Sequence, residues 1–163
     1  MSRGGYIHNR VLLDPIEASF RARGASASRE YPVKLGRRLG FVDLFVLLGC
    51  LRIAIEVELS PKRVDKDVEK AEALRARWLL IVTPRQRIAQ ACARRLKGMR
   101  PHPNLTIIFL TLGTAVEWVA NCFPLMTQPN DFQKRNHQPA LPAMATKAAA
   151  NQISPHRKFH PKP

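Results

Sequence analysis

The chain has 163 residues, which is enough for one domain with a hydrophobic core and too few for two domains of ordinary size. Its 27 Lys and Arg outnumber 12 Asp and Glu, giving a formal net charge of +15. Such a charge predicts a polyanionic partner, nucleic acid first of all, with a mere aid to solubility as the alternative. No run approaches the roughly 20 apolar residues of a membrane span, and the start lacks a signal-peptide core, so we expect no membrane partner.

Three cysteines, Cys50, Cys92 and Cys122, are widely spaced in apolar surroundings. Because their number is odd and no Cys-x-x-Cys pair occurs, they are interpreted as buried thiols rather than disulfides or zinc ligands. A reducing, cytoplasmic location is the expectation.

The first element is predicted to be a helix that begins at Asp14, with Asp as the cap, Pro15 at the first helical position and Glu17 three residues after the cap. Gly24 suits its end. Extended runs follow at Tyr31–Leu35, Phe41–Leu48 and Leu51–Leu59.

The second and third extended runs meet at Gly49-Cys50, which predicts a two-residue hairpin of type II′. Residues whose numbers sum to 99 are then cross-strand partners, so Asp43 lies opposite Glu56 and Phe41 opposite Glu58. The other face becomes wholly apolar, with Val42, Leu44 and Val46 opposite Val57, Ile55 and Ile53. A slip by one residue would mix the two faces, so the pattern itself favours this register.

The remaining elements are expected to be a helix at Pro61–Ala76, a strand at Trp78–Thr83, a helix at Gln86–Lys97, a strand at Asn104–Leu112 and a last helix. Residues 1–123 therefore predict one α/β domain. Residues 124–163 are basic and proline-rich without apolar periodicity, which predicts a flexible, disordered basic tail.

Asp43, Glu56 and Glu58 are acids on strands of a strongly basic chain, and the register places the first two side by side. Directly opposed like charges repel each other, so folding alone would not choose them. They either share a proton, hold a cation such as Mg²⁺, or pair with some of the many Arg and Lys side chains.

The order of elements, with Gly40-Phe41-Val42-Asp43 and Ile55-Glu56-Val57-Glu58, resembles the PD-(D/E)XK, or restriction-endonuclease-like, nuclease superfamily over residues 10–83. The resemblance implies a central mixed β-sheet flanked by helices (an αβββαβ core), hydrolysis of DNA, and dependence on Mg²⁺ or Mn²⁺. It assigns Asp43 and Glu56 as catalytic metal ligands, with Glu17 of the first helix as a further ligand.

Glu58 departs from the family, because it stands where the motif has lysine. Either Glu58 acts as base or second ligand, or a lysine from elsewhere substitutes; Lys70 is the preferred catalytic surrogate and Lys62 the next. Glu17 also has a structural alternative, as a member of a capping box with Asp14.

The function expected from these residues is a Mg²⁺-dependent deoxyribonuclease, with the oligomeric state, including a homodimer, left open. The alternatives are a nucleic-acid-binding protein that retains a nuclease-like fold without catalysis, and a protein-interaction module that uses its tail for assembly. Basic residues around the acids are candidates for phosphate contacts: Lys34, Arg37, Arg38, Lys62, Arg63, Arg85 and Arg87.

Overall fold

A computed structural model describes residues 3–123. They form a five-stranded mixed sheet in the order β1-β2-β3-β4-β5, in which β1, β2 and β3 are antiparallel neighbours and β3, β4 and β5 run parallel. The strands are β1 (Ser26–Leu35), β2 (Arg38–Leu48), β3 (Leu51–Val57), β4 (Trp78–Thr83) and β5 (Thr106–Thr111). The helices are α1 (Arg3–Tyr6), η1 (Ile7–Leu13), α2 (Asp14–Arg21), η2 (Pro61–Arg63), α3 (Val64–Ala73), α4 (Gln86–Arg95) and α5 (Leu112–Cys122).

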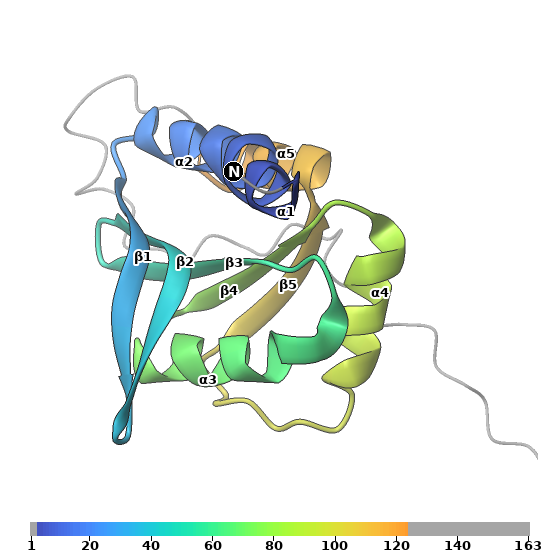
Figure 1. Cartoon of the computed structure of the whole chain (residues 1–163). Helices are drawn as coiled ribbons and strands as arrows, with labels where there is room; N and C mark the ends of the chain where they lie inside the picture. The colour runs from blue at the N-terminus through green and yellow to red at the C-terminus, as the bar shows by residue number, and fades with distance from the viewer. Residues whose placement is uncertain (1–2, 124–163) are drawn as a thin grey trace, which may run out of the picture.

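Helices cover both faces of the sheet, as Figure 1 shows. One hydrophobic core joins η1, α2 and α5 to Leu44, Val46, Ile53 and Ile55. The other joins α3 and α4 to the opposite sheet face, through residues such as Ala54. Strand β4 is buried along its whole length because it lies between both layers. The expected α/β architecture with a mixed sheet flanked by helices is confirmed.

The N-terminal helix begins earlier than predicted. The segment from Arg3 to Arg21 is continuously helical, and Asp14 lies within it rather than at its start. Pro15 removes one backbone donor inside this helix, and the turns before it use π-type bonding, with Asp14 N–H donating to Asn9 O. The predicted cap and capping box are therefore wrong. Gly24 does end the helix, at φ 78°.

The predicted β2–β3 register is confirmed for the five pairs from Leu44–Ile55 to Leu48–Leu51. Gly49 has φ 59°, the positive value that a type II′ turn requires at its first central residue. Cys50 is exposed in this turn, so the prediction that all three cysteines are buried is wrong; Cys92 is buried and Cys122 is half-buried.

The ladder ends at Leu44–Ile55, so the Asp43–Glu56 and Phe41–Glu58 pairs of the predicted register do not form. The β1–β2 ladder is also interrupted, between Arg29–Leu44 and Tyr31–Val42, where Glu30 has φ 47°. Beyond this break Val42 packs in the α3 core, whereas Leu44 packs in the α2 core. The predicted single apolar face from Val42 to Val46 is thus wrong, because the hairpin turns over at Asp43.

Among the other elements β4 has its predicted bounds, while β1 starts five residues earlier than expected and β3 ends two residues earlier. The helix expected at Pro61–Ala76 is divided into η2 and α3. The tail predicted for residues 124–163 lies outside the described residues. Within the described part of the chain, no helix is long and apolar enough to cross a membrane.

Candidate functional site

Asp43 lies at the point where β2 separates from β3. Its Oδ2 accepts a hydrogen bond from the backbone N–H of Val57 at 2.8 Å, and so takes the place of a strand carbonyl at the end of the ladder. The same oxygen lies 3.0 Å from Nε2 of His8, which η1 brings over this edge. The carboxylate therefore fills the opening between the two strands.

Glu56 belongs to the buried part of β3. Its neighbours Ile55 and Val57 point into the α2 core, so alternation along the strand turns Glu56 toward α3. Only 2% of the residue is exposed. An acid in such a position requires a cation or a proton.

Lys70 of α3 supplies the cation. Its Nζ lies 2.6 Å from Oε1 of Glu56 and 2.8 Å from Oδ1 of Asp67, and it donates a hydrogen bond to Phe41 O at 3.1 Å. The stem of the lysine passes over Gly40, where an added Cβ would lie 3.7 Å from Cδ of Lys70. The resemblance expects a lysine at position 58, directly after β3, where this chain has Glu58. Helix α3 brings Lys70 to Glu56 instead.

Asp67 and Glu58 complete the cluster. Asp67 lies one helical turn before Lys70 and is 3% exposed. Glu58 follows β3, is half-buried, and its carboxyl group interacts with that of Asp67, so that each affects the pKa of the other. We call Asp43, Glu56, Glu58, Asp67 and Lys70 the acidic cluster.

The charges of the acidic cluster do not balance. Burial and the neighbouring Asp67 and Asp43 raise the pKa of Glu56 to about 9. Burial and Asp67 raise the pKa of Glu58 to about 8. Burial also raises the pKa of Asp67, although Lys70 opposes it. Four carboxyl groups share one ammonium and the His8 imidazole, so the cluster keeps protons near neutral pH. Because Lys70 holds Glu56 in an ion pair, the shared proton is best placed between Glu58 and Asp67.

Asp43 and Lys70 show the opposite tendency. Burial alone would raise the pKa of Asp43, but the hydrogen bonds from His8 and from the Val57 N–H hold it below its ordinary value. Burial would lower the pKa of Lys70, and the two adjacent carboxylates outweigh this and raise it. Asp43 therefore stays ionised at neutral pH.

The donor set fits Mg²⁺ or Mn²⁺, which take oxygen ligands and need only one or two carboxylates because they keep several waters. Oε1 of Glu56 and Oδ2 of Asp67 are buried and accept no hydrogen bond of normal geometry within the described residues. Across residues 3–123, however, no three His, Cys, Asp or Glu side chains are arranged around a common point as metal ligands. Lys70 Nζ lies between two of the acids instead, so an ion bound by Asp43 and Glu56 would have to compete with it.

Glu17, the third ligand suggested by the resemblance, is not brought to the acidic cluster. Its carboxylate pairs with Arg21 at 2.8 Å and with Arg29 at 2.5 Å. Arg29 also pairs with Asp14, at 2.6 Å. Glu17 belongs to this separate surface network, which we call the arginine network.

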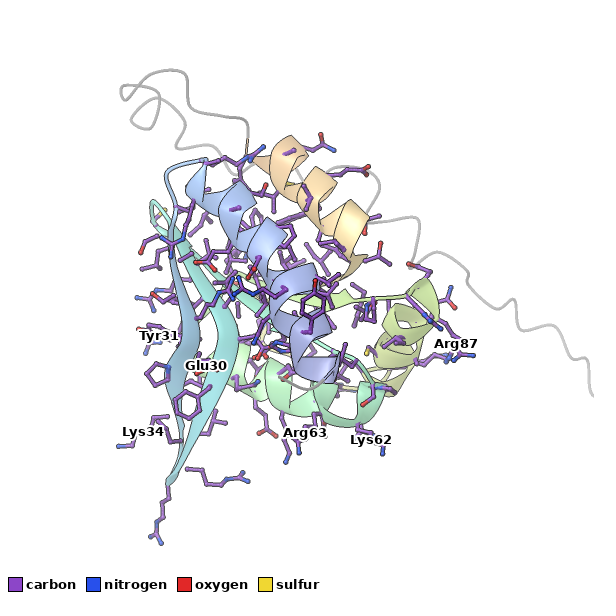
Figure 2. The ribbon with its side chains drawn as sticks, turned by 45° about the horizontal axis from the view of Figure 1, so that its top comes forward. Glu30, Tyr31, Lys34, Lys62, Arg63 and Arg87 are labelled. Carbon is purple, nitrogen blue, oxygen red and sulfur yellow. The ribbon has the colours of Figure 1, made fainter. Side chains whose placement is uncertain are left out.

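The seven basic residues assigned to phosphate contacts are all exposed. Lys34, Arg37 and Arg38 lie at the far end of the β1–β2 hairpin, Lys62 and Arg63 at the start of the α3 segment, and Arg85 and Arg87 at the start of α4. Figure 2 shows Lys34 on one side of the N-terminal helices, Lys62 and Arg87 on the other, and Arg63 between them below the end of the helices. Among the described residues, the ion pairs do not include any of the seven, so their charges are directed to solvent.

Two members of the site were not found from the sequence. Asp67 carried a usable signal, because it lies three residues after Val64 and three before Lys70, on the stripe predicted to be buried. His8 was missed because the helix was expected to begin only at Asp14, and because its contact with Asp43 spans 35 residues.

No protein-family model matches this chain, and no curated protein matches it in sequence. The resemblance to nucleases therefore depends on the order of the elements and on the residues named above.

Proposed function

We propose that this protein is a divalent-metal-dependent nuclease of the PD-(D/E)XK type that cleaves DNA. The observation that carries the proposal is the pair of buried carboxylates, Glu56 and Asp67, held with Asp43 at the opening between β2 and β3. A domain selected only for stability would place apolar residues there, since a buried ionic group rarely adds to stability.

In this proposal Asp43 and Glu56 hold the metal ion, and Lys70 on α3 takes the place of the motif lysine. When bound, the ion would supply a Lewis acid for the phosphate and lower the pKa of a coordinated water. Lys70 lies 2.6 Å from Glu56, from where its ammonium can contact a phosphate oxygen or orient the attacking water. Glu58, with a pKa raised to about 8, keeps its proton at neutral pH and would act as a base only above that pH or once a bound cation lowers its pKa.

The basic surface supports nucleic acid as the substrate. The exposed cations on the hairpin, at η2 and at the start of α4 suit contacts with phosphates, which position a strand without reading its sequence. A chain with a net charge of +15 would gather a polyanion around a site that is itself acidic.

One observation favours a second candidate, a nucleic-acid-binding protein without catalysis. Lys70 Nζ already occupies the position between Glu56 and Asp67, at ion-pair distance from both. In this reading the lysine is a permanent counterion and the acids no longer bind metal. The two candidates differ in a single measurable property, metal-dependent cleavage.

The test uses the full chain with supercoiled plasmid, single-stranded and branched DNA, in Mg²⁺, Mn²⁺ or EDTA. We expect cleavage with metal only, and its loss in Asp43→Asn and Glu56→Gln. The loss should exceed the roughly 10–100-fold effect typical of residues that merely support metal ligands. Glu56→Gln keeps the shape of the side chain and leaves Asp67 as a partner for Lys70, so its fold should survive.

Glu69→Gln is the matched control, because it removes an exposed carboxylate from α3, the helix that carries Asp67 and Lys70. It should cleave as the wild type does. Cleavage that persists in EDTA would contradict the proposal. An absence of cleavage with every substrate and ion, together with DNA binding, would establish the second candidate.

A further inference from the structure

The outer half of the β1–β2 hairpin is a two-stranded ribbon. Strand β3 pairs with β2 only from Leu44 onward, so residues 31–42 have no third strand beside them. We call these residues the ribbon. Figure 1 shows it extending beside α3 to a turn beyond the helix.

The two faces of the ribbon differ. Val33 and Val42 are buried on the inner face, in the core that α3 covers. The outer face is exposed and contains two cross-strand pairs, Pro32 with Phe41 and Lys34 with Leu39.

The outer face is apolar where solvent should favour polar residues. Leu39 is 65% exposed and Phe41 is 51% exposed, the two highest values among large aliphatic residues and phenylalanines in the described chain. They lie two residues apart on β2, so both project to the same side. An exposed patch of this kind, bordered by charge, indicates a binding surface.

The charge of the ribbon indicates what it binds. Residues 31–42 contain Lys34, Arg37 and Arg38 and no acid. Apolar side chains among cations suit an unpaired nucleic-acid strand, whose bases stack on aromatic rings while its phosphates contact Lys and Arg. A paired duplex hides its base faces and would leave Phe41 and Leu39 without a partner.

The ribbon leads directly to the acidic cluster. Phe41 O accepts the hydrogen bond from Lys70, and Asp43 is two residues further along β2, about 6.5–7 Å away along the strand. Most of the acids lie toward the inner, α3-covered side, so a strand bound on the outer face would reach them past Asp43 at the opening between β2 and β3.

We propose that Phe41 and Leu39 on the outer face of the ribbon bind unpaired bases, so that the ligand is DNA with a single-stranded segment rather than continuous duplex. This inference depends on the proposed function only in taking nucleic acid as the ligand of the site. Phe41 supplies the stacking surface, Leu39 extends it, and Lys34, Arg37 and Arg38 contact the phosphates.

The test measures binding in EDTA, where no cleavage enters. A labelled oligonucleotide is titrated by fluorescence anisotropy, single-stranded or annealed to its complement. Phe41→Ser should weaken single-strand binding about fivefold or more, as loss of one stacked base predicts, and should change duplex binding by less than about twofold. Leu39→Ser should act in the same direction with a smaller effect.

Two matched variants separate stacking from other effects. Leu47→Ser alters another exposed apolar residue of β2, outside the ribbon, and should bind both DNA forms as the wild type does. Arg38→Gln should weaken both forms alike and reduce the slope of log affinity against log salt by roughly one, whereas Phe41→Ser should leave the slope unchanged. Thermal unfolding confirms that each variant is folded.

Equal losses on single-stranded and duplex DNA in Phe41→Ser, or no loss on either, would overturn the inference. A wild-type dimer that Phe41→Ser converts to a monomer in sedimentation would also overturn it, since the face would then bind a second copy. Selective loss of single-strand binding by a protein that cleaves nothing would retain the ribbon and reject the nuclease.

Discussion

The acidic cluster and the arginine network are two groups of charged residues in one small domain, and they differ in the balance of charge. In the arginine network Arg10, Arg21 and Arg29 surround the carboxylates of Asp14 and Glu17. Its acids have lowered pKa values: hydrogen bonding to Arg29 lowers that of Asp14, and the arginines outweigh burial at Glu17. In the acidic cluster four carboxyl groups share Lys70 and His8.

Charges are balanced in the arginine network and unbalanced in the acidic cluster, so the unfavourable electrostatic interactions of this fold are concentrated in the acidic cluster. Every acid of the arginine network has a guanidinium beside it and remains ionised at ordinary pH. The acidic cluster has fewer cations than acids although the chain has 27 Lys and Arg, and most of the Lys and Arg side chains among the described residues are exposed. A locally unsatisfied group in a domain that is otherwise consistent is typical of a functional site.

Removing the central cation from the acidic cluster should have the largest effect on the stability of the protein. Lys70→Met keeps the stem that passes over Gly40 but leaves Glu56 and Asp67 without their ammonium. At pH 8 the free energy of unfolding should fall by about 3–5 kcal/mol, the cost of leaving buried charge uncompensated. Urea denaturation measures it.

The double variant Lys70→Met with Asp67→Asn provides the control. Removing one carboxylate with the lysine should recover a large part of the lost stability, because fewer charges remain uncompensated. If Lys70→Met is as stable as the wild type, the lysine is not the counterion that holds the cluster together.

A divalent cation bound at the acidic cluster of the wild-type protein should supply positive charge that the four carboxyl groups lack. At a Mg²⁺ concentration about 100 times its dissociation constant, the wild type should gain about 2.7 kcal/mol in free energy of unfolding, measured by urea denaturation with and without the ion. The gain should vanish in Asp43→Asn and persist in Asp14→Asn, which removes an acid from the arginine network. An equal gain in both variants would mean that the ion binds without regard to the site.

These groups also show what the sequence could and could not predict. The β2–β3 register followed from apolar alternation on both strands and from Gly49, which are local signals. The break at Asp43 did not, because it depends on a positive φ at Glu30, a residue type with no preference for that conformation. Lys70 was expected because it flanks a periodic apolar stripe, whereas the contact of His8 with Asp43 exists only once the N-terminal helix packs on the sheet.

Glu17 was assigned to the site from the sequence, but the structure places it elsewhere. Its place in the first helix suggested either a metal ligand or a capping box, and in the structure it pairs with Arg21 and Arg29. The helix begins eleven residues before Asp14, so no helix start exists at that point. The partner Arg29 lies on β1, and its approach depends on how the hairpin folds back onto α2.

The stability of the protein should also depend on pH, because Glu58 of the acidic cluster has a raised pKa. Glu58 keeps its proton up to about pH 8 in the folded protein, because its pKa is raised from an ordinary value of 4.5 to about 8. The folded state therefore binds more protons between these values, and the free energy of unfolding should fall as pH rises from about 5 to 8. We expect about 1–2 kcal/mol, because solvent screening at this half-exposed group removes most of what the shift alone implies.

Glu58→Gln should flatten this decline, since the variant has no proton to lose at that position. The raised pKa values of Glu56, Asp67 and His8 contribute in the same direction, so a smaller slope should remain. A profile that is the same in Glu58→Gln and in the wild type would show that Glu58 ionises normally in the folded protein.

The smallest effect is expected in the arginine network. Arg29 contacts both Asp14 and Glu17, but its side chain is 36% exposed, and exposed ion pairs contribute about 0.2–1 kcal/mol. Arg29→Met should therefore lower the free energy of unfolding by about that amount, in contrast to the much larger loss for Lys70→Met. The difference between Arg29→Met and the wild type should shrink in high salt, because screening weakens exposed charges first. The loss in Lys70→Met should persist at the same salt concentration, since its partners are buried. Equal losses in the two variants, or equal sensitivity to salt, would mean that burial does not separate the two groups of charges and that the acidic cluster is a second structural network.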